Sequence, residues 1–236
     1  MDSRARDIRD IAPFVALPRS ERIALAASSR FHDWNHGDCL FHAEKPDGEV
    51  IVLIRGLARL YRAARDESEV TISIVPPGHI LNIGGLTGAA MQEIRAEAVG
   101  TARTIHLATP EFLALGSRCP SFFEQVASAL VARTDALYAD AMSLPMAPLA
   151  TRILNILQRV ARPASPQADL TALQPLAHRL TQAEIARLVG AHRSSVTRAL
   201  AALEEQGLVR RERGRITGVC SALTEKETEP LQAHRR

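Results

Sequence analysis

The sequence predicts an α+β fold in three parts: an N-terminal jelly-roll β-barrel, one long helix and a C-terminal winged helix-turn-helix. Three observations support this prediction. Short apolar runs broken by turns fill residues 31–107, which is typical of a sandwich or barrel. A helical pattern then runs from Pro120 to the neighbourhood of Met142. Finally, two short amphipathic helices meet at Gly190.

These patterns set the expected boundaries. We assign residues 1–118 to the barrel, 119–144 to the long helix, 145–224 to the winged helix-turn-helix and 225–236 to a tail. Short helices are expected over residues 13–17 and 20–28 and beyond Pro148, and strands over residues 50–54, 57–62, 70–74 and 104–107. We expect a turn at Arg55-Gly56 and a looser connection over residues 162–179.

The most informative segment is 180–209. Thr181 and Glu184 have the S/T-x-x-E spacing of a capping box, which predicts a helix start. Gly190 can adopt the positive φ of a turn at little steric cost. Apolar residues recur at helical spacing on both helices: Ile185, Leu188, Val189, Val196, Leu200 and Leu203. An ordinary helical hairpin is the alternative interpretation.

The polar face of the second helix indicates DNA reading. An arginine fork can donate two hydrogen bonds to guanine O6 and N7. We expect base contacts from four residues: Arg193, Ser194, Ser195 and Arg198. Thr181, Gln182 and Thr197 are expected to contact phosphates. His192 stands where a helix-capping Ser or Thr would be usual.

Residues 208–216 have the pattern strand, turn, strand, with arginines around the tip. Such a hairpin, or wing, lies along phosphates beside a recognition helix, and we expect phosphate contacts from Arg211, Arg213 and Arg215. A merely solvated hairpin is the alternative.

The long helix carries a stripe spaced 4, 3, 4, 3, 4, which is typical of a coiled-coil seam: Phe123, Ala127, Leu130, Thr134, Leu137 and Ala141. This stripe could instead pack on the barrel. Because Phe122 and Val126 offer a second apolar side for the barrel, we interpret the stripe as a dimer contact.

Composition narrows the class of protein. A length of 236 residues suits two modest domains, and the formal net charge of only +3 means that basicity is local. Three cysteines stand far apart without C-x-x-C spacing, which fits a reducing cytosol: Cys39, Cys119 and Cys220. No apolar run approaches the ~20 residues of a membrane helix. We expect a cytoplasmic protein without a secretory signal.

The order of barrel, long helix and winged helix-turn-helix resembles the cyclic-AMP receptor protein (CRP/FNR) superfamily of bacterial transcription regulators. The resemblance spans nearly the whole chain and is most specific in residues 181–185 and 193–198, with support from Gly37-Asp38 and Pro77-Gly78. It implies a cyclic-nucleotide-binding-like barrel, a homodimer on an inverted-repeat DNA site, and activation through RNA polymerase. Many members carry Glu where this chain has Ser194, so the preference at one base pair should differ.

The sensor segment departs from the superfamily's cyclic-nucleotide binders, which have Gly-Glu followed by Arg-Ser. Here Asn82-Ile83 and Gln92-Glu93 occupy those places. Since the cassette arginine neutralises the cyclic phosphate and an acidic residue would repel it, we expect no binding of cyclic AMP. Arg95 could replace that arginine only under a shifted alignment. A loop facing another effector is one alternative: Asn82, Gly84, Gly85 and Thr87. Regulation without a small ligand, by abundance or thiol oxidation, is the other.

Other cofactors and an enzymatic role find little support. An iron–sulfur cluster needs grouped cysteines, and this sequence has none. Haem stays open through the conceivable axial ligands His42, His79 and His106. A cupin-like metal enzyme is the rival class, because His32, His36 and His42 lie close in sequence, but H-x-H spacing and a following carboxylate are missing. We expect a protein that is not an enzyme.

Overall fold

The computed structural model describes residues 3–42, 48–63, 69–82, 94–143, 147–161 and 173–220. The chain divides into two compact units, Met1–Asp140 and Ala141–Arg236. The predicted α+β class is confirmed, since an antiparallel sheet forms the first unit and a helix-turn-helix forms the second. The expected tail, 225–236, lies outside the described residues.

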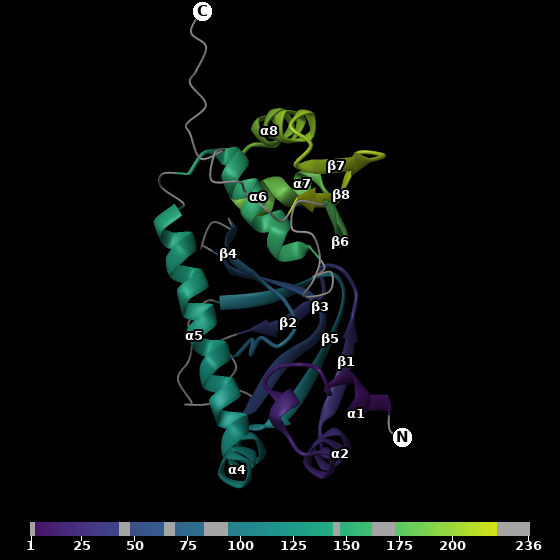
Figure 1. The fold of residues 1–236 in the computed structure, drawn as a ribbon, viewed down its shortest axis with the longest axis vertical. Helices are drawn as coiled ribbons and strands as arrows, with labels where there is room; N and C mark the ends of the chain where they lie inside the picture. Colours follow the sequence, from purple (N-terminus) through teal and green to yellow (C-terminus); the bar gives the residue numbers. More distant parts are fainter. Residues whose placement is uncertain are drawn as a thin grey trace, which may run out of the picture. The chain divides into compact units, whose positions relative to one another are not determined.

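The first unit is built on a curled sheet (Figure 1). Its strands are β1 (Arg30–Trp34), β2 (Cys39–His42), β3 (Glu49–Ala63), β4 (Glu69–Val75) and β5 (Ile94–Ala108). They follow the order β1-β5-β3-β4, with β2 also paired to β5, and every pairing is antiparallel. The pairing of β3 with β5 runs from Glu49↔Ala108 to Arg62↔Ile94 and is the longest strand pairing in the described part of the unit.

The apolar run at the start of β3 is buried on both faces. Val50, Val52 and Ile54 point into one apolar cluster, while Ile51 and Leu53 point into another. A strand covered on both sides has no polar face, which explains why these residues do not alternate with polar ones.

The predicted turn at Arg55-Gly56 is wrong. The strand continues through these residues, and its register with β5 shifts between Leu53 and Arg55 and again between Arg55 and Leu57. Gly56 has φ +80°, and a Cβ there would lie 2.2 Å from the carbonyl oxygen of Thr101. The glycine therefore permits a bulge at which two backbones approach closely.

Helices cover one face of the sheet, where their apolar side chains share a core cluster with Val50, Val52 and Ile54 of β3. They are α1 (Ser3–Asp7), the 3-10 turn η1 (Phe14–Ala16), α2 (Arg19–Ser28), α4 (Thr109–Arg118) and α5 (Pro120–Ser143). The sequence patterns did not predict α4. Its Phe112 ring lies 5.1 Å from that of Phe122 on α5, and the Phe14 ring lies 6.1 Å from Phe122, so the helices share one aromatic core.

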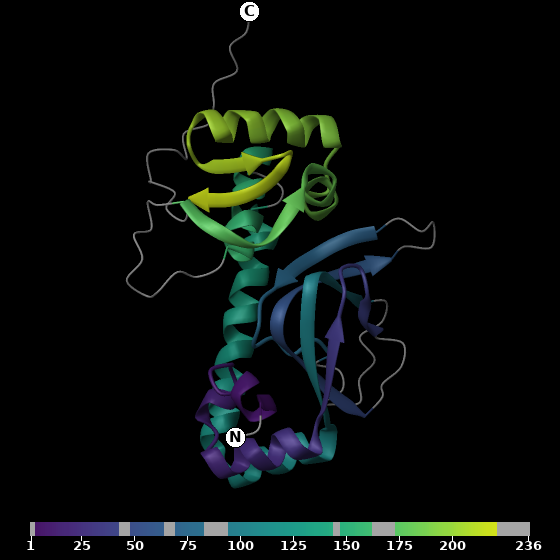
Figure 2. The same ribbon diagram turned by 90° about the vertical axis from the view of Figure 1, so that its right-hand side faces the viewer.

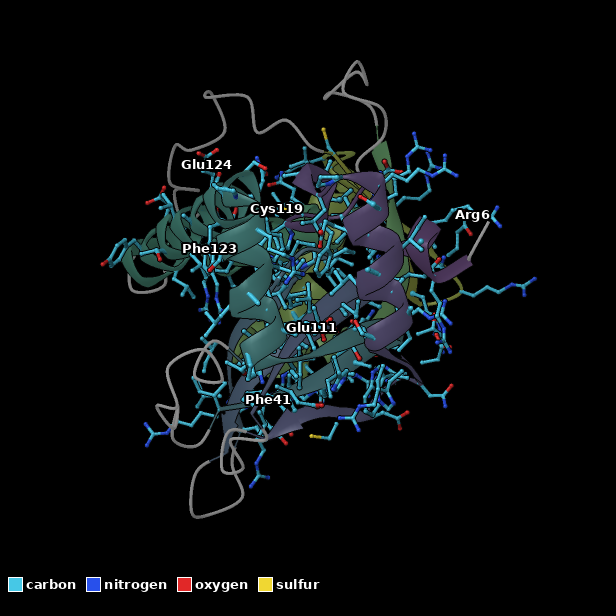
Figure 3. All side chains as sticks on the ribbon, turned by 90° about the horizontal axis from the view of Figure 1, so that it is seen from below. Arg6, Phe41, Glu111, Cys119, Phe123 and Glu124 are labelled. Carbon is cyan, nitrogen blue, oxygen red and sulfur yellow. The ribbon has the colours of Figure 1, made fainter. Side chains whose placement is uncertain are left out.

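The long helix α5 lies along the barrel (Figures 1 and 2). Phe122 and Val126 are buried in the core, as the sequence predicted. On the seam, Phe123, labelled in Figure 3, is 38% exposed and its ring lies against Gly116 of α4. Ala127 and Thr134 are exposed, and Leu130 packs partly on the barrel core. The side chain of Ala141 lies outside the described residues.

The second unit combines three helices with a small sheet: α6 (Leu149–Val160), β6 (Leu173–Thr181), α7 (Gln182–Val189), α8 (Arg193–Glu205), β7 (Val209–Glu212) and β8 (Arg215–Cys220). The strand order is β6-β8-β7. The expected loose connection over residues 162–179 is wrong from Leu173 onward, because β6 pairs with β8 there. Pro175, which lacks an N–H group, is tolerated because β6 is an edge strand.

We expect Gly56→Ala to destabilise the barrel by about 3 kcal/mol or more, since it adds both a backbone clash and left-handed strain. Gly48→Ala is the matched control: Gly48 has φ +64° but open space around its Cβ position, so only about 1 kcal/mol should be lost. Urea unfolding of the full chain measures both. Equal losses would show that the bulge does not constrain the fold.

Candidate nucleic-acid interface

The first helix of the motif, α7, is fixed at its N-terminus by the predicted capping box. The Thr181 N–H donates to Glu184 Oε2 at 2.6 Å, and the Glu184 N–H donates to Thr181 Oγ1 at 3.2 Å. The Thr181 hydroxyl accepts in this pair, so its own proton stays available to a phosphate.

The C-terminus of α7 is closed in a different way. Gly190 has φ 61° and ψ 46°, the left-handed conformation that the sequence predicted. The next N–H, of Ala191, donates to Ala186 O at 3.0 Å. The guanidinium of Arg152 on α6 donates to Val189 O, which places a cation at the negative end of the helix.

The second helix, α8, has two clearly different faces. Val196, Leu200 and Leu203 are buried, at 2% exposure or less. Three of the four predicted base-reading residues are exposed, and Ser195 is half-buried: Arg193, Ser194, Ser195 and Arg198. His192 begins the helix without a side-chain capping bond, as expected. The arginines are therefore free to extend into a groove while the helix stays anchored.

A side-chain contact connects the starts of the two helices. The Thr197 hydroxyl on α8 lies 2.9 Å from Gln182 Oε1 on α7 and 2.9 Å from Arg193 O. Thr197 is thus engaged within the motif, whereas the amide nitrogen of Gln182 can still donate to a phosphate. The two predicted phosphate contacts lie together.

The wing is a hairpin of β7 and β8 with a two-residue tip. Arg213 has φ 49° and Gly214 has φ 75°, and positive φ at both positions is the mark of a type I′ turn. Arg213 and Arg215 are exposed, as phosphate contacts require. Arg211 is different, because its Nε lies 2.6 Å from Glu204 Oε2 on α8 and its Nη2 also donates to that oxygen.

The surface that results is basic. Residues 180–216 contain seven arginines and four glutamates. Two of these glutamates are bonded within the motif, Glu184 in the capping box and Glu204 with Arg211. The hydrogen bonds from Arg211 hold the pKa of Glu204 below its ordinary value. Arg152 and Glu204 were not found by sequence reasoning, because neither residue has a local pattern that points to its partner.

The barrel residues considered as sensors have other roles where they are described. The Asn82 amide is buried: its Oδ1 accepts from Ile51 N at 2.7 Å and its Nδ2 donates to Glu49 O at 2.5 Å. Asn82 therefore holds the edge of β3, which leaves the effector loop to Gly84, Gly85 and Thr87, outside the described residues.

Two of the candidate haem histidines, His79 and His106, have described side chains. His106 Nε2 lies 3.0 Å from Thr104 Oγ1, and burial lowers the pKa of His106. Burial, with the nearby Arg133 cation, lowers the pKa of His79 to about 4. The side chain of His42 lies outside the described residues.

The described residues bear on two classes of protein, metal-binding proteins and membrane proteins. No three His, Cys, Asp or Glu side chains among them are grouped to hold a metal ion. No helix in this part of the chain is long and apolar enough to span a bilayer.

The chain matches known proteins over most of its length. Residues 149–219 match the Crp-like helix-turn-helix domain family. A CRP-like cAMP-activated global transcriptional regulator of Mycobacterium tuberculosis (strain ATCC 25618 / H37Rv) is 25% identical over 199 residues, covering 84% of this chain and 88% of that protein.

Two solved structures share the fold. The c-di-GMP responsive global regulator CLP of Xanthomonas campestris aligns with a TM-score of 0.63 at 18% identity, covering 85% of this chain and 99% of that one. A CooA mutant from Carboxydothermus hydrogenoformans aligns with a TM-score of 0.64 at 18% identity, covering 85% and 86%. Residues 149–219 therefore belong to the Crp-like helix-turn-helix domain family, the solved structures share the fold of the chain, and together with the capped helix-turn-helix these findings support a CRP/FNR-type DNA-binding transcription regulator.

Proposed function

We propose that this regulator binds an inverted repeat in double-stranded DNA as a homodimer, with α8 of each subunit in a major groove. The observation that carries the proposal is the two-faced α8, whose apolar side is buried while Arg193, Ser194 and Arg198 are exposed. A buried face fixes the helix, and the exposed arginines have the donor geometry that guanine edges accept.

Base reading and backbone binding fall to different residues in this proposal. Arg193, Ser194, Ser195 and Arg198 contact base edges. The phosphate contacts come from Thr181, Gln182, Arg213 and Arg215, while Thr197, predicted as a phosphate contact, orients Gln182 through its hydroxyl. Ser194 discriminates less sharply than the glutamate common in the superfamily, because a hydroxyl can both donate and accept.

The dimer contact is proposed along α5. Large apolar side chains are exposed on this helix, with Val131 61% and Tyr138 65% exposed. Together with the exposed Ala127 and Thr134 of the seam, they leave an apolar surface that a second α5 would cover. Two subunits paired in this way would present two recognition helices to successive turns of the duplex, ~34 Å apart.

Control is proposed to pass through the barrel, with activation by contact with RNA polymerase. The Mycobacterium tuberculosis relative is named as cAMP-activated. Gln92-Glu93 align with the Arg-Ser of the cassette, so we propose an effector other than cyclic AMP.

A regulator without a small ligand is the second candidate, favoured by the departures in the cassette. Thiol control is the weaker form of it, since Cys119 and Cys220 are buried and burial raises the pKa of Cys39.

Arg193→Ala is expected to cost about 1–3 kcal/mol of binding free energy at one base position and to relax the preference there. Selection from a random DNA library, followed by titration of single-base variants, measures this cost. Arg9→Ala, at an exposed arginine of the barrel unit, is the control and should change nothing. Failure of the wild type to prefer any palindromic sequence would refute the proposed function.

Ala127→Glu tests the dimer seam. Ala127 is exposed, so the change should leave the subunit folded, but in a dimer it would bury unpaired carboxylates and raise the dissociation constant at least about tenfold. Ala132→Glu, also exposed on α5 but off the seam, is the matched control. Sedimentation equilibrium separates the outcomes; a dimer undisturbed by Ala127→Glu rejects this seam.

Cyclic AMP should leave the DNA dissociation constant unchanged within about twofold. If the barrel does not bind the nucleotide, the nucleotide cannot favour the DNA-binding conformation over any other. Fluorescence anisotropy of labelled operator, with and without the nucleotide, checks this expectation. A large tightening would show that the departures in the cassette do not prevent binding.

A further inference from the structure

The wing is joined to the recognition helix by a short connection and one ion pair. The helix α8 ends at Glu205, and β7 begins at Val209. Gly207, with φ 74°, turns the chain between them. Two residues into β7, Arg211 reaches back to Glu204 in the last turn of α8, as the closeness of these elements in Figure 2 allows.

This pair is partly shielded from water and well directed. The Arg211 side chain is 23% exposed and that of Glu204 is 36% exposed. Two guanidinium N–H groups, Nε and Nη2, point at one carboxylate oxygen, which fixes the plane of the guanidinium. The lowered pKa of Glu204 agrees with a carboxylate that stays charged in this pair.

Beyond the pair, the two strands of the hairpin are joined by a ladder whose register shifts between Arg210 and Arg211. Glu212 pairs with Arg215 directly across the type I′ turn, and Val209 pairs with Val219 at the base. Val209 and Val219 are buried, at 2% and 0% exposure. The arginine-bearing tip is therefore held from two sides: β8 pairs with β6 as far as Thr181↔Arg215, and β7 is held against α8 by Arg211.

We propose that Glu204 and Arg211 form a latch that positions the wing, so that Arg213 and Arg215 meet the phosphates beside the groove that α8 enters. Arg211 is then a positioning residue, which revises its predicted role as a phosphate contact. The proposal rests on the DNA binding proposed above and names the residue pair that connects base reading to backbone binding.

The latch makes a prediction opposite in sign to simple electrostatics. Removing a glutamate near DNA takes away a repelling charge and should tighten binding. Removal of Glu204 should also tighten binding if Arg211 leaves Glu204 to bind a phosphate in the complex, because Glu204 would then no longer compete with that phosphate for Arg211. If Glu204 holds the wing, its removal instead weakens binding and lowers the salt dependence by about one unit for each phosphate that the wing no longer neutralises.

Glu204→Ala and Glu205→Ala in the full chain form a matched pair. Glu205 is exposed, and its substitution removes the same charge from the same helix turn. We expect Glu204→Ala to weaken operator binding about tenfold, with a shallower dependence of log K on log salt. Glu205→Ala should bind as well as the wild type or slightly better. Equal or tighter binding by Glu204→Ala overturns the latch.

Two further variants separate positioning from folding. Arg213→Asn removes the tip charge and keeps the turn, since Asn tolerates positive φ. In the Arg213→Asn background, Glu204→Ala should weaken operator binding clearly less than it does in the wild type, because one of the two arginines that Glu204 helps to position is already absent. The exchange Glu204→Arg with Arg211→Glu should recover binding. Full additivity, or no recovery in a chain with unchanged thermal unfolding, contradicts the proposal.

The controls also separate this proposal from the one on which it rests. If the wild type binds no DNA, the proposed function fails. If the wild type binds and Arg193→Ala relaxes its specificity, but Glu204→Ala matches Glu205→Ala, only the latch fails.

Discussion

The recognition surface depends on how the two ends of α7 satisfy their backbone polar groups. A helix of eight residues leaves about four N–H and four C=O groups without partners and is too short to be stable alone. Thr181 and Glu184 satisfy one end, and Gly190 with the guanidinium of Arg152 satisfies the other. Because both ends are fixed, the direction in which the chain enters α8 is fixed as well.

That constraint explains how charge is distributed over the motif. Glu184 and Glu204 are both bonded to partners inside the domain, so neither acts as a free negative charge at the surface. Arg193, Arg198 and Arg213 remain exposed. The acidic residues therefore stabilise the fold of a surface whose outer charge is basic, and a modest net charge for the whole chain is compatible with strong local attraction of DNA.

The fold was predictable where its cause is local. The capping box, the turn at Gly190 and the apolar stripe of α8 each involve residues within about one helix length, and all three are confirmed. The strand β6 was missed because its partner β8 lies some forty residues further on and its own sequence contains Pro175. At Gly56 a local pattern cannot distinguish a turn from a bulge, since both need positive φ; the close approach of Thr101 on β5 decides between them.

Within the candidate site too, local features could be predicted from the sequence, and contacts between distant residues could not. The residue types on α8 and the wing were visible in the sequence, but the partners of Thr197 and Arg211 come from packing. These two contacts connect elements that the sequence treats as separate: α7 to α8, and α8 to β7. A helix that reads bases and a hairpin that holds the backbone must both fit one duplex, so their relative orientation matters as much as the side chains they carry. Single contacts between the elements can therefore influence DNA binding without touching the DNA.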